Sequence, residues 1–166
     1  MTAYHLAQLN IGRLLAPLDS EQLAGFVARL ADINALADAA PGFVWRFQTE
    51  DGDATSVRPY DDERVIVNFS VWKTPDHLHA FVYRTAHAEV MRRRREWFAR
   101  LTEAYTVLWW VPAGHHPTVA EACERLARLR EEGESPEAFS FRKLFPPPGA
   151  DPEPRLEALA DECPAP

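Results

Sequence analysis

The stretch from Arg64 to Trp72 carries large apolar side chains on both faces of a predicted β-strand. Because successive side chains of a strand point to opposite faces, Ile66 and Trp72 lie on the same face. The other face receives an unbroken apolar set: Val65, Val67, Phe69 and Val71. A sheet that contains such a strand must be covered on both faces, since a large exposed apolar surface is unfavourable in water.

The spacing of apolar residues and the positions of turn residues predict the order of elements along the chain. We expect strands over residues 4–10, 43–48, 64–72 and 105–111, an edge strand over 139–145, and helices over 20–38, 75–83, 85–103 and 117–132. Whether the chain breaks at Arg84 and Thr85, between the two middle helices, is left open. The order predicts an α+β, ferredoxin-like βαββαβ fold with an antiparallel sheet, to which a C-terminal helix and a short strand are added.

The expected fold leaves one face of the sheet without helices, although the strands are apolar on both faces. A second copy packed sheet to sheet covers that face, which predicts a homodimer built through the sheet faces. The chain of 166 residues suits one domain, expected over residues 1–145. A proline-rich, acidic C-terminal tail is expected over residues 146–166.

Charge and cysteine usage limit the classes of partner. The chain has 25 acidic and 18 basic residues and a formal net charge of -7, which argues against nucleic acid as a partner. Cys123 and Cys163 form no CxxC motif, and we expect both to be reduced in the cytoplasm. No segment approaches about 18 uncharged apolar residues, so neither secretion nor contact with a membrane is expected.

An apolar stripe with two polar interruptions runs through residues 85–101. On a helix, His87 and Arg94 share the face of Trp97, where a core is expected. A buried arginine without a partner costs several kcal/mol. The stripe therefore predicts either internal partners or a pocket at this face, and His87 and Arg94 become the candidate catalytic pair.

The two interruptions have functional and structural interpretations. His87 can act as a general base, a hydrogen-bond donor or a metal ligand, because its ordinary pKa of about 6.5 allows both protonation states near neutral pH. Arg94 offers a fixed charge and planar donors that suit a carboxylate or enolate oxygen. The structural alternatives are a core histidine with satisfied nitrogens and an ion pair of Arg94 with Glu21, Asp76 or another acid. We expect a solvated face for the neighbouring Arg92, Arg93 and Arg95.

Polar side chains interrupt three apolar strands in pairs that share a face: Gln8 with Asn10, Arg46 with Gln48, and Asn68 with Ser70. Polar groups that converge in an apolar cavity are typical of a ligand site. We expect Asn10, Asn68 and Arg46, together with Tyr83 and Trp97, to contact a substrate. The structural alternatives are strand ends near solvent or satisfied dimer contacts for the polar pairs, and core or interface packing for the tryptophans.

The sequence predicts no metal site. His77 and His79 are two residues apart and cannot share a helical face. His115 and His116 lie in a predicted loop, and no spacing typical of zinc ligands accompanies them. GxGxxG, GxxxxGK and GxSxG motifs do not occur, which disfavours nucleotide binding through those loops and serine hydrolysis at an elbow.

The runs FVYRTAHAEVMRRRREWF, HLAQLNIGRL, GFVWRF and LWWVPAGHHPTVAEA carry a resemblance that covers most of residues 4–145. They resemble an uncharacterised bacterial family in the dimeric α/β-barrel superfamily. That placement implies the dimeric ferredoxin-like fold already expected from the pattern. The superfamily includes antibiotic-biosynthesis monooxygenases, muconolactone-type isomerases, haem-degrading monooxygenases and stress-response proteins, and a shared fold leaves the chemistry open.

Haem-degrading monooxygenases of that superfamily look similar in placing an asparagine on the first strand and an iron-binding histidine on the helix after the third strand. Asn10 and His87 match these positions in type and approximate place. The tryptophan that those enzymes carry on the same helix has no counterpart, because residues 81–83 lie where it would fall.

The functional prediction is an enzyme that acts on a small apolar or aromatic metabolite without an organic cofactor, as a monooxygenase or an isomerase. His87 moves the proton in this hypothesis. Arg94, Asn10 and Asn68 hold negative charge that develops on a substrate oxygen. Two alternatives are a non-catalytic ligand-binding or stress-related dimer and a haem-binding protein with His87 as the axial ligand.

Overall fold

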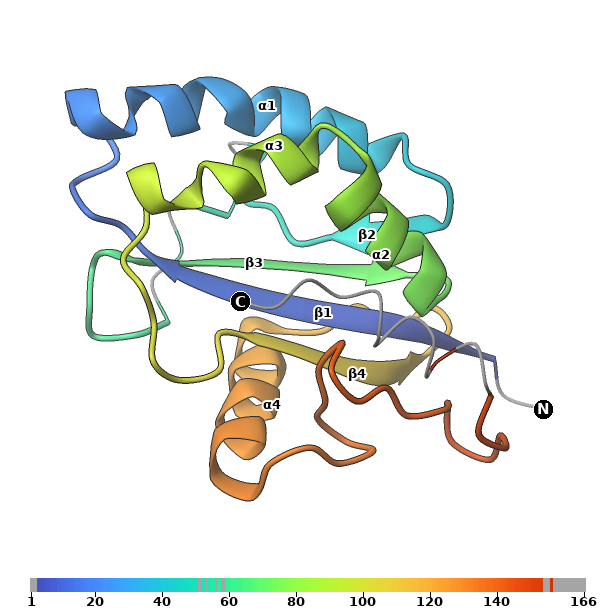
Figure 1. The fold of residues 1–166 in the computed structure, drawn as a ribbon. Coiled ribbons are helices and arrows are strands. Elements are labelled where there is room, and N and C mark those ends of the chain that lie inside the picture. Colours follow the sequence, from blue (N-terminus) through green and yellow to red (C-terminus); the bar gives the residue numbers. More distant parts are fainter. Residues whose placement is uncertain are drawn as a thin grey trace.

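The computed structural model describes residues 3–50, 52, 54–55, 57, 59–153 and 156. Its four strands form one antiparallel sheet in the order β2-β3-β1-β4 (Figure 1). The bounds are Tyr4–Arg13 for β1, Phe43–Arg46 for β2, Val65–Trp72 for β3 and Thr106–Pro112 for β4. The α+β class and the antiparallel sheet are confirmed, and the strand order is consistent with a ferredoxin-like arrangement.

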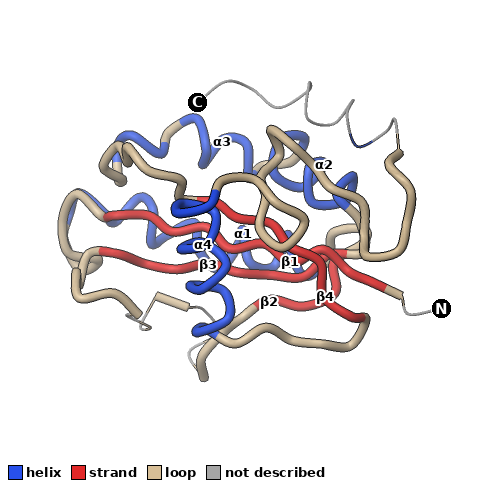
Figure 2. The backbone as a smooth tube through the Cα atoms, turned by 90° about the horizontal axis from the view of Figure 1, so that it is seen from below, coloured by secondary structure: helices blue, strands red, loops and turns tan. Residues whose placement is uncertain are grey.

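Helices cover both faces of this sheet. They are α1 (Ala24–Asp38), α2 (Pro75–Arg84), α3 (His87–Arg92) and α4 (Val119–Glu132), with short 3-10 helices η1 (Glu21–Leu23) and η2 (Arg94–Glu96). Figure 1 shows α1, α2 and α3 on one side of the sheet and α4 on the other, and Figure 2 shows α4 crossing the strands. None of the described helices is both long and apolar enough to span a membrane.

The face under α1, α2 and α3 is divided into apolar ends and a polar middle. In the β1–β3 register, Leu6 pairs with Trp72 at one end, and Gly12 pairs with Ile66 at the other. Separate apolar clusters form around Trp72 and around Ile66. Two polar pairs lie between them along the strands: Gln8 with Ser70 and Asn10 with Asn68. The polar pairs expected on β1 and β3 therefore lie on the face of the sheet that α1, α2 and α3 cover.

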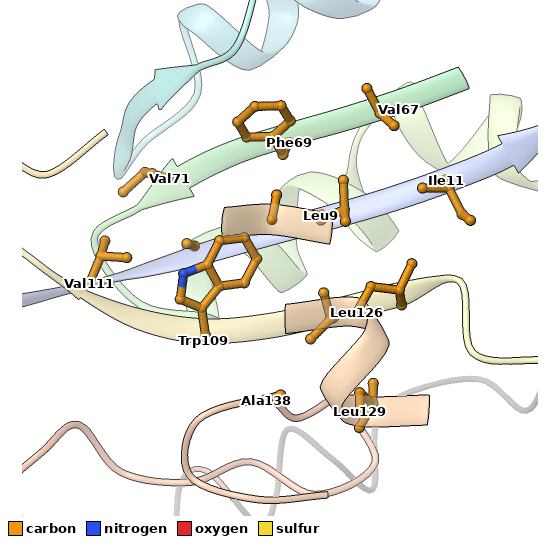
Figure 3. Packing of buried hydrophobic residues seen from close by; sticks show 13 residues of the cluster. Leu9, Ile11, Val67, Phe69, Val71, Trp109, Val111, Leu126, Leu129 and Ala138 are labelled. Atoms are coloured by element: carbon orange, nitrogen blue, oxygen red, sulfur yellow. The ribbon is translucent and has the colours of Figure 1, made fainter. Parts of the chain in front are cut away.

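The opposite face is already covered within one chain. Leu126 and Leu129 of α4 are buried with Leu9, Phe69 and other inward residues of β1, β3 and β4 in a single cluster (Figure 3). Phe69 is 1% exposed and Leu9 is fully buried. The expectation of a bare sheet face is therefore wrong, because the added C-terminal helix packs on it. The homodimer stays a prediction, but a bare sheet face no longer supports it.

The single helix expected over residues 85–103 is wrong. Thr85 is extended and separates α2 from α3; its hydroxyl donates to the Phe81 carbonyl and accepts from the His87 N–H at 3.2 Å. After η2 the chain stops being helical because it pairs with the end of β1 instead. Leu15 N donates to Trp97 O at 2.9 Å, and residue 99 donates to residue 13 at 2.8 Å.

The edge strand expected over residues 139–145 is reduced to one bridge. Phe139 exchanges two backbone hydrogen bonds with Leu108 of β4, at 2.7 and 2.9 Å. Ser140 then begins a turn that closes on Lys143, so the backbone leaves the sheet. The boundary between domain and tail at residue 145 stays a prediction; Leu156, beyond that boundary, is buried.

Smaller differences concern the ends of elements. The first strand continues three residues beyond the expected end to Arg13, and β2 ends at Arg46 instead of residue 48. The helix expected over residues 20–38 begins with the 3-10 turn η1 before α1. The helix expected from residue 117 begins at Val119, where the Thr118 side chain accepts a hydrogen bond from the Glu121 N–H.

Candidate functional site

A cavity of about 140 Å³ lies on the face of the sheet that α1, α2 and α3 cover, and α1, α3, η2 and the first three strands bound it. A cavity of about 150 Å³ is known to hold benzene, so this one accepts a group of about one ring. Much of its wall is apolar and comes from Ile11, Phe26, Leu30, Ile33, Val90 and Met91. Five of the predicted site residues lie in its lining: His87, Arg94, Asn10, Asn68 and Arg46.

The Asn10–Asn68 pair forms the polar part of the floor. The Asn10 Oδ1 atom is buried and has no hydrogen-bond partner among the described residues. Asn68, its register partner on β3, is exposed, so the floor is open to solvent at this strand. A buried carbonyl oxygen without a partner is unfavourable, and a ligand that donates a hydrogen bond to it would remove that cost.

The next polar pair is satisfied internally. The Trp72 indole N–H donates to Ser70 Oγ at 2.9 Å, and the Ser70 hydroxyl donates to Gln8 Oε1 at 3.2 Å. Ser70 and Gln8 are each 8% exposed. This relay holds β1, β3 and the tryptophan together, whereas Asn10 Oδ1 of the neighbouring pair has no partner among the described residues.

Gly12 allows one wall of the cavity to form. A Cβ atom at this position would lie 2.6 Å from two ring carbons of Phe98, so only glycine leaves room for that ring against β1. Phe98 is held there because its backbone forms an antiparallel β-bridge with Leu14, just beyond the end of β1. The same pairing that ends the helical region therefore places an aromatic wall over the strand.

His87 opens α3 with its ring fixed in one orientation. Its Nδ1 atom lies 3.2 Å from the carbonyl oxygen of Val82, and the ring packs beside Phe81 with centroids 5.0 Å apart. Since the carbonyl only accepts, Nδ1 carries the proton and the neutral ring keeps its lone pair on Nε2. Burial lowers the pKa of His87, and the hydrogen bond to Val82 opposes this in part. Neutral imidazole is therefore the main form at pH 7.

Arg94 is oriented by a neutral partner. Its Nη1 donates to the Tyr105 hydroxyl at 2.8 Å, and its guanidinium carbon lies 4.5 Å from the centre of that ring. The ion pair with Glu21 or Asp76 considered from the sequence does not form. A half-buried guanidinium that keeps its full charge beside an apolar cavity attracts an anionic or carbonyl oxygen.

Two further arginines line the cavity, and both are engaged within the chain. Arg46 donates from Nε and Nη2 to the Asp38 carboxylate at 2.7 and 3.2 Å, which neutralises its charge. Arg29 of α1 donates to the Gly25 carbonyl at 2.5 Å and stands over the Trp97 ring. Neither Asp nor Glu occurs among the lining residues that the structure describes. The cavity is therefore electropositive, with Arg94 as the cation best placed for a ligand.

Other predicted site residues lie elsewhere. Trp97 is 2% exposed and packs in the core against Phe26, with ring centroids 5.8 Å apart, and is not part of the cavity lining. Tyr83 lines a separate cleft at the far side of Arg94. Gln48 is exposed beyond the end of β2, so only Arg46 of that pair reaches the site.

Sequence reasoning missed several lining residues: Gly12, Arg29, Asn34, Thr55 and Phe98. A glycine inside a strand is itself a signal of close approach by another group, so Gly12 could have been found. Arg29 and Asn34 interrupt the apolar spacing of α1 in the way that His87 and Arg94 interrupt the later stripe. Within the described ranges, no three His, Cys, Asp or Glu side chains gather where a metal ion could bind.

The family model described as Domain of unknown function (DUF3291) matches residues 5–156. The chain belongs to the DUF3291 family. The family resemblance found in the sequence is thereby supported at the level of a family of unknown function; placement of this DUF3291 chain in the dimeric α/β-barrel superfamily stays a prediction.

Two other comparisons add little to the DUF3291 assignment. No curated protein matches the chain. The crystal structure of the NE2512 protein of unknown function from Nitrosomonas europaea aligns with 71% of this chain and 97% of its own chain. The two are 13% identical with a TM-score of 0.43, and at that score the similarity carries no argument about function.

Proposed function

We propose that the cavity binds a small, largely apolar carbonyl compound and moves a proton on it. The observation that carries this proposal is the pairing, in one cavity, of a neutral histidine with an arginine that has no acidic partner among the described residues. The volume of about 140 Å³ sets the size of the apolar part at about one ring. The absence of carboxylates among the described lining residues favours an oxygen-bearing, electron-rich ligand.

The chemistry follows from the two side chains. His87 Nε2 accepts a proton from the carbon next to the substrate carbonyl, and the electron pair of the broken C–H bond moves onto the carbonyl oxygen. Arg94 and the Asn68 amide N–H group stabilise that enolate oxygen, while Asn10 Oδ1 accepts a hydrogen bond from a ligand hydroxyl or enol. Return of the proton from His87 to a different carbon completes an isomerisation without any further reactant.

A monooxygenase would begin with the same proton abstraction and then consume molecular oxygen. The two reactions are separated by an oxygen electrode, because an isomerase turns over at the same rate in air and under argon. We infer no organic cofactor for the isomerisation, since every proton it moves is carried by His87.

The haem alternative has less support from the cavity. Pockets for ligands of drug size enclose about 300–1,000 Å³, and a porphyrin belongs at the upper part of that range. About 140 Å³ beside His87 does not fit such a macrocycle. An absorption spectrum after addition of haem tests this directly: a Soret band that disappears in His87→Gln would favour haem binding over the isomerase.

The first experiment on the proposed reaction is deuterium exchange at the enolisable carbon of phenylpyruvate, followed by NMR in D₂O. The wild-type protein should accelerate exchange over buffer. His87→Gln keeps a donor for the Val82 carbonyl and removes the base, so we expect a loss of about 100-fold or more. His116→Gln is the matched control, because His116 is an exposed loop residue outside the cavity. Equal exchange in His87→Gln and wild type would refute the proposal.

A non-catalytic binding protein is the second candidate. It predicts saturable binding of phenylacetate, measured by calorimetry, together with exchange of phenylpyruvate no faster than in buffer. The Asn10 Oδ1 atom, which has no partner among the described residues, is compatible with this alternative, because a bound ligand can donate to it without any reaction.

A further inference from the structure

A second pocket, called the cleft below, is also lined by Arg94. It is a cleft of about 910 Å³ between the segment that leads from η2 to β4 and the loop around residues 133–142. Figure 1 shows the first of these segments descending past the end of the sheet to β4. At this volume the cleft belongs to the range of sites for ligands larger than one ring.

The cleft and the cavity share a boundary. Arg94 and Phe98 line both, and they are held from opposite sides: Phe98 against Gly12 of β1, and Arg94 by Tyr105 in the cleft. A ligand that fills the cavity with its apolar end and the cleft with a longer chain would therefore have its connecting carbonyl group at Arg94.

The cleft is lined by more basic than acidic residues. Of its two acidic residues, Glu103 lies 3.6 Å from Arg130, whereas Glu134 accepts from the Ser140 N–H and hydroxyl at 2.8 and 2.7 Å and keeps its negative charge. Three arginines besides Arg94 line the cleft with no carboxylate partner in the described part of the chain: Arg95, Arg100 and Arg142. With Glu134 as the one acid of the cleft that has no arginine partner among the described residues, the arginines still give the cleft a local excess of positive charge in a protein of net charge -7.

We propose that the cleft holds the phosphorylated chain of an acyl thioester whose ring-sized acyl group occupies the cavity. This inference rests on the proposed function and names its substrate class. The arginines match phosphate oxygens, which they bind through paired N–H donors. A thioester places its carbonyl at the junction, where Arg94 stands, and makes the adjacent C–H bond acidic enough for His87 to act on.

The test compares three ligands by calorimetry: phenylacetate, coenzyme A and phenylacetyl-coenzyme A. The thioester should bind at least about 10-fold more tightly than either fragment, because one molecule then engages both hollows. Its affinity should fall steeply between about 50 mM and about 500 mM salt, while that of phenylacetate changes less. Equal affinities of phenylacetate and its thioester would overturn the inference.

Substitution of the cleft arginines tests whether the cleft causes the tighter binding of the thioester. In the double variant Arg100→Ala/Arg142→Ala, the ratio of thioester affinity to phenylacetate affinity should fall at least about 10-fold. Arg128→Ala on α4 is the charge-matched control, because Arg128 pairs with Glu132 and lines neither hollow, and the ratio should stay at the wild-type value. An unchanged ratio in the double variant would contradict the assignment.

The two proposals fail in different ways. If phenylacetate binds and its thioester binds no better, the cleft assignment is wrong and the cavity proposal stands. If coenzyme A binds but phenylacetate adds nothing to it, the acyl group has no place in the cavity, and both proposals are wrong.

Discussion

Arg94 is fixed by Tyr105 from a neighbouring segment: a 2.8 Å hydrogen bond joins Nη1 to the phenol oxygen, and the guanidinium lies over the ring. Tyr105 is itself anchored, because its carbonyl accepts the backbone N–H of Ile11 on β1 at 2.9 Å. The sheet therefore positions the cation through a side chain that leaves its charge uncompensated. This is the arrangement expected where an arginine must serve an incoming oxygen and not an internal acid.

Tyr105→Phe should weaken binding of phenylacetate about 3-fold to 10-fold. The substitution removes one hydrogen bond, worth about 0.5–1.5 kcal/mol, and keeps the ring under the guanidinium. Calorimetry of the variant gives the affinity, and Arg94→Gln, which removes the charge, should lose more. An affinity of Tyr105→Phe equal to that of wild type would show that the phenol does not position Arg94.

Gly12→Ala should close the cavity. The new Cβ atom would overlap the Phe98 ring, which must then leave its present place in the cavity wall. We expect a loss of about 1–3 kcal/mol in the free energy of unfolding, typical of overpacking, and no measurable binding of phenylacetate.

Gly25→Ala is the contrasting glycine variant. A Cβ atom there would meet its nearest neighbour, Arg29 Nη1, at 3.5 Å, which is an ordinary contact. Alanine in α1 should then raise the free energy of unfolding by about 0.4–1 kcal/mol. Urea unfolding of both variants checks the pair; a stable Gly12→Ala with normal binding would mean that the Phe98 wall is not rigid.

The strands of the sheet could be predicted because the alternation of side chains along each strand is a local signal in the sequence. Alternating side chains predict the two faces of each strand, over residues 64–72 and over residues 4–10. The register then makes Asn10 and Asn68 direct partners, so their side chains share a face. The helix over 85–103 could not be corrected from its apolar spacing. What ends it is backbone pairing of residues 97–99 with β1, a contact between segments more than 80 residues apart that has no local signal.

The sequence argument that placed His87 and Arg94 together rested on an incorrect helix. His87 and Arg94 line one cavity, although Thr85 and the turn into η2 interrupt the continuous helix from which their shared face was argued. Trp97, placed on that face by the same spacing, turns into the core instead. The cleft had no signal in the sequence, because its walls come from segments that are far apart in the chain, chiefly residues 94–106 and 133–142, and only the tertiary fold brings them together.

Asn10→Leu should separate stability from binding. The substitution removes a buried oxygen without a described partner and adds apolar surface of similar volume, so the free energy of unfolding should stay equal or rise by about 1 kcal/mol. Binding of phenylacetate and exchange of phenylpyruvate should both fall. A large loss of stability would show that the Asn10 amide is needed by the fold.

Ser70→Ala tests the adjacent polar pair, which we interpret as structural. It leaves the Trp72 N–H and Gln8 Oε1 without the hydroxyl that joins them, and should lower the free energy of unfolding by about 1–3 kcal/mol. Because Ser70 does not line the cavity, the affinity for phenylacetate measured below the unfolding temperature should remain that of wild type.

His87 should make both stability and proton transfer depend on pH in the same direction. Burial holds its pKa in the folded protein below the ordinary value of about 6.5 that the unfolded chain retains. Between these two values the unfolded chain binds a proton that the folded protein does not, so the free energy of unfolding decreases as the pH falls through this interval. Above about 6.5 the contribution is constant.

Urea unfolding at several pH values between about 5 and 8, with wild type, His87→Gln and His116→Gln, isolates this contribution. His87→Gln should lose part of the decrease toward acid, and a larger part than His116→Gln loses. The exchange of phenylpyruvate should fall toward acid with a midpoint below about 6.5, because protonation of Nε2 removes the base. A midpoint above that value would require a neighbouring carboxylate at the ring, and the cavity lining offers none within the described residues.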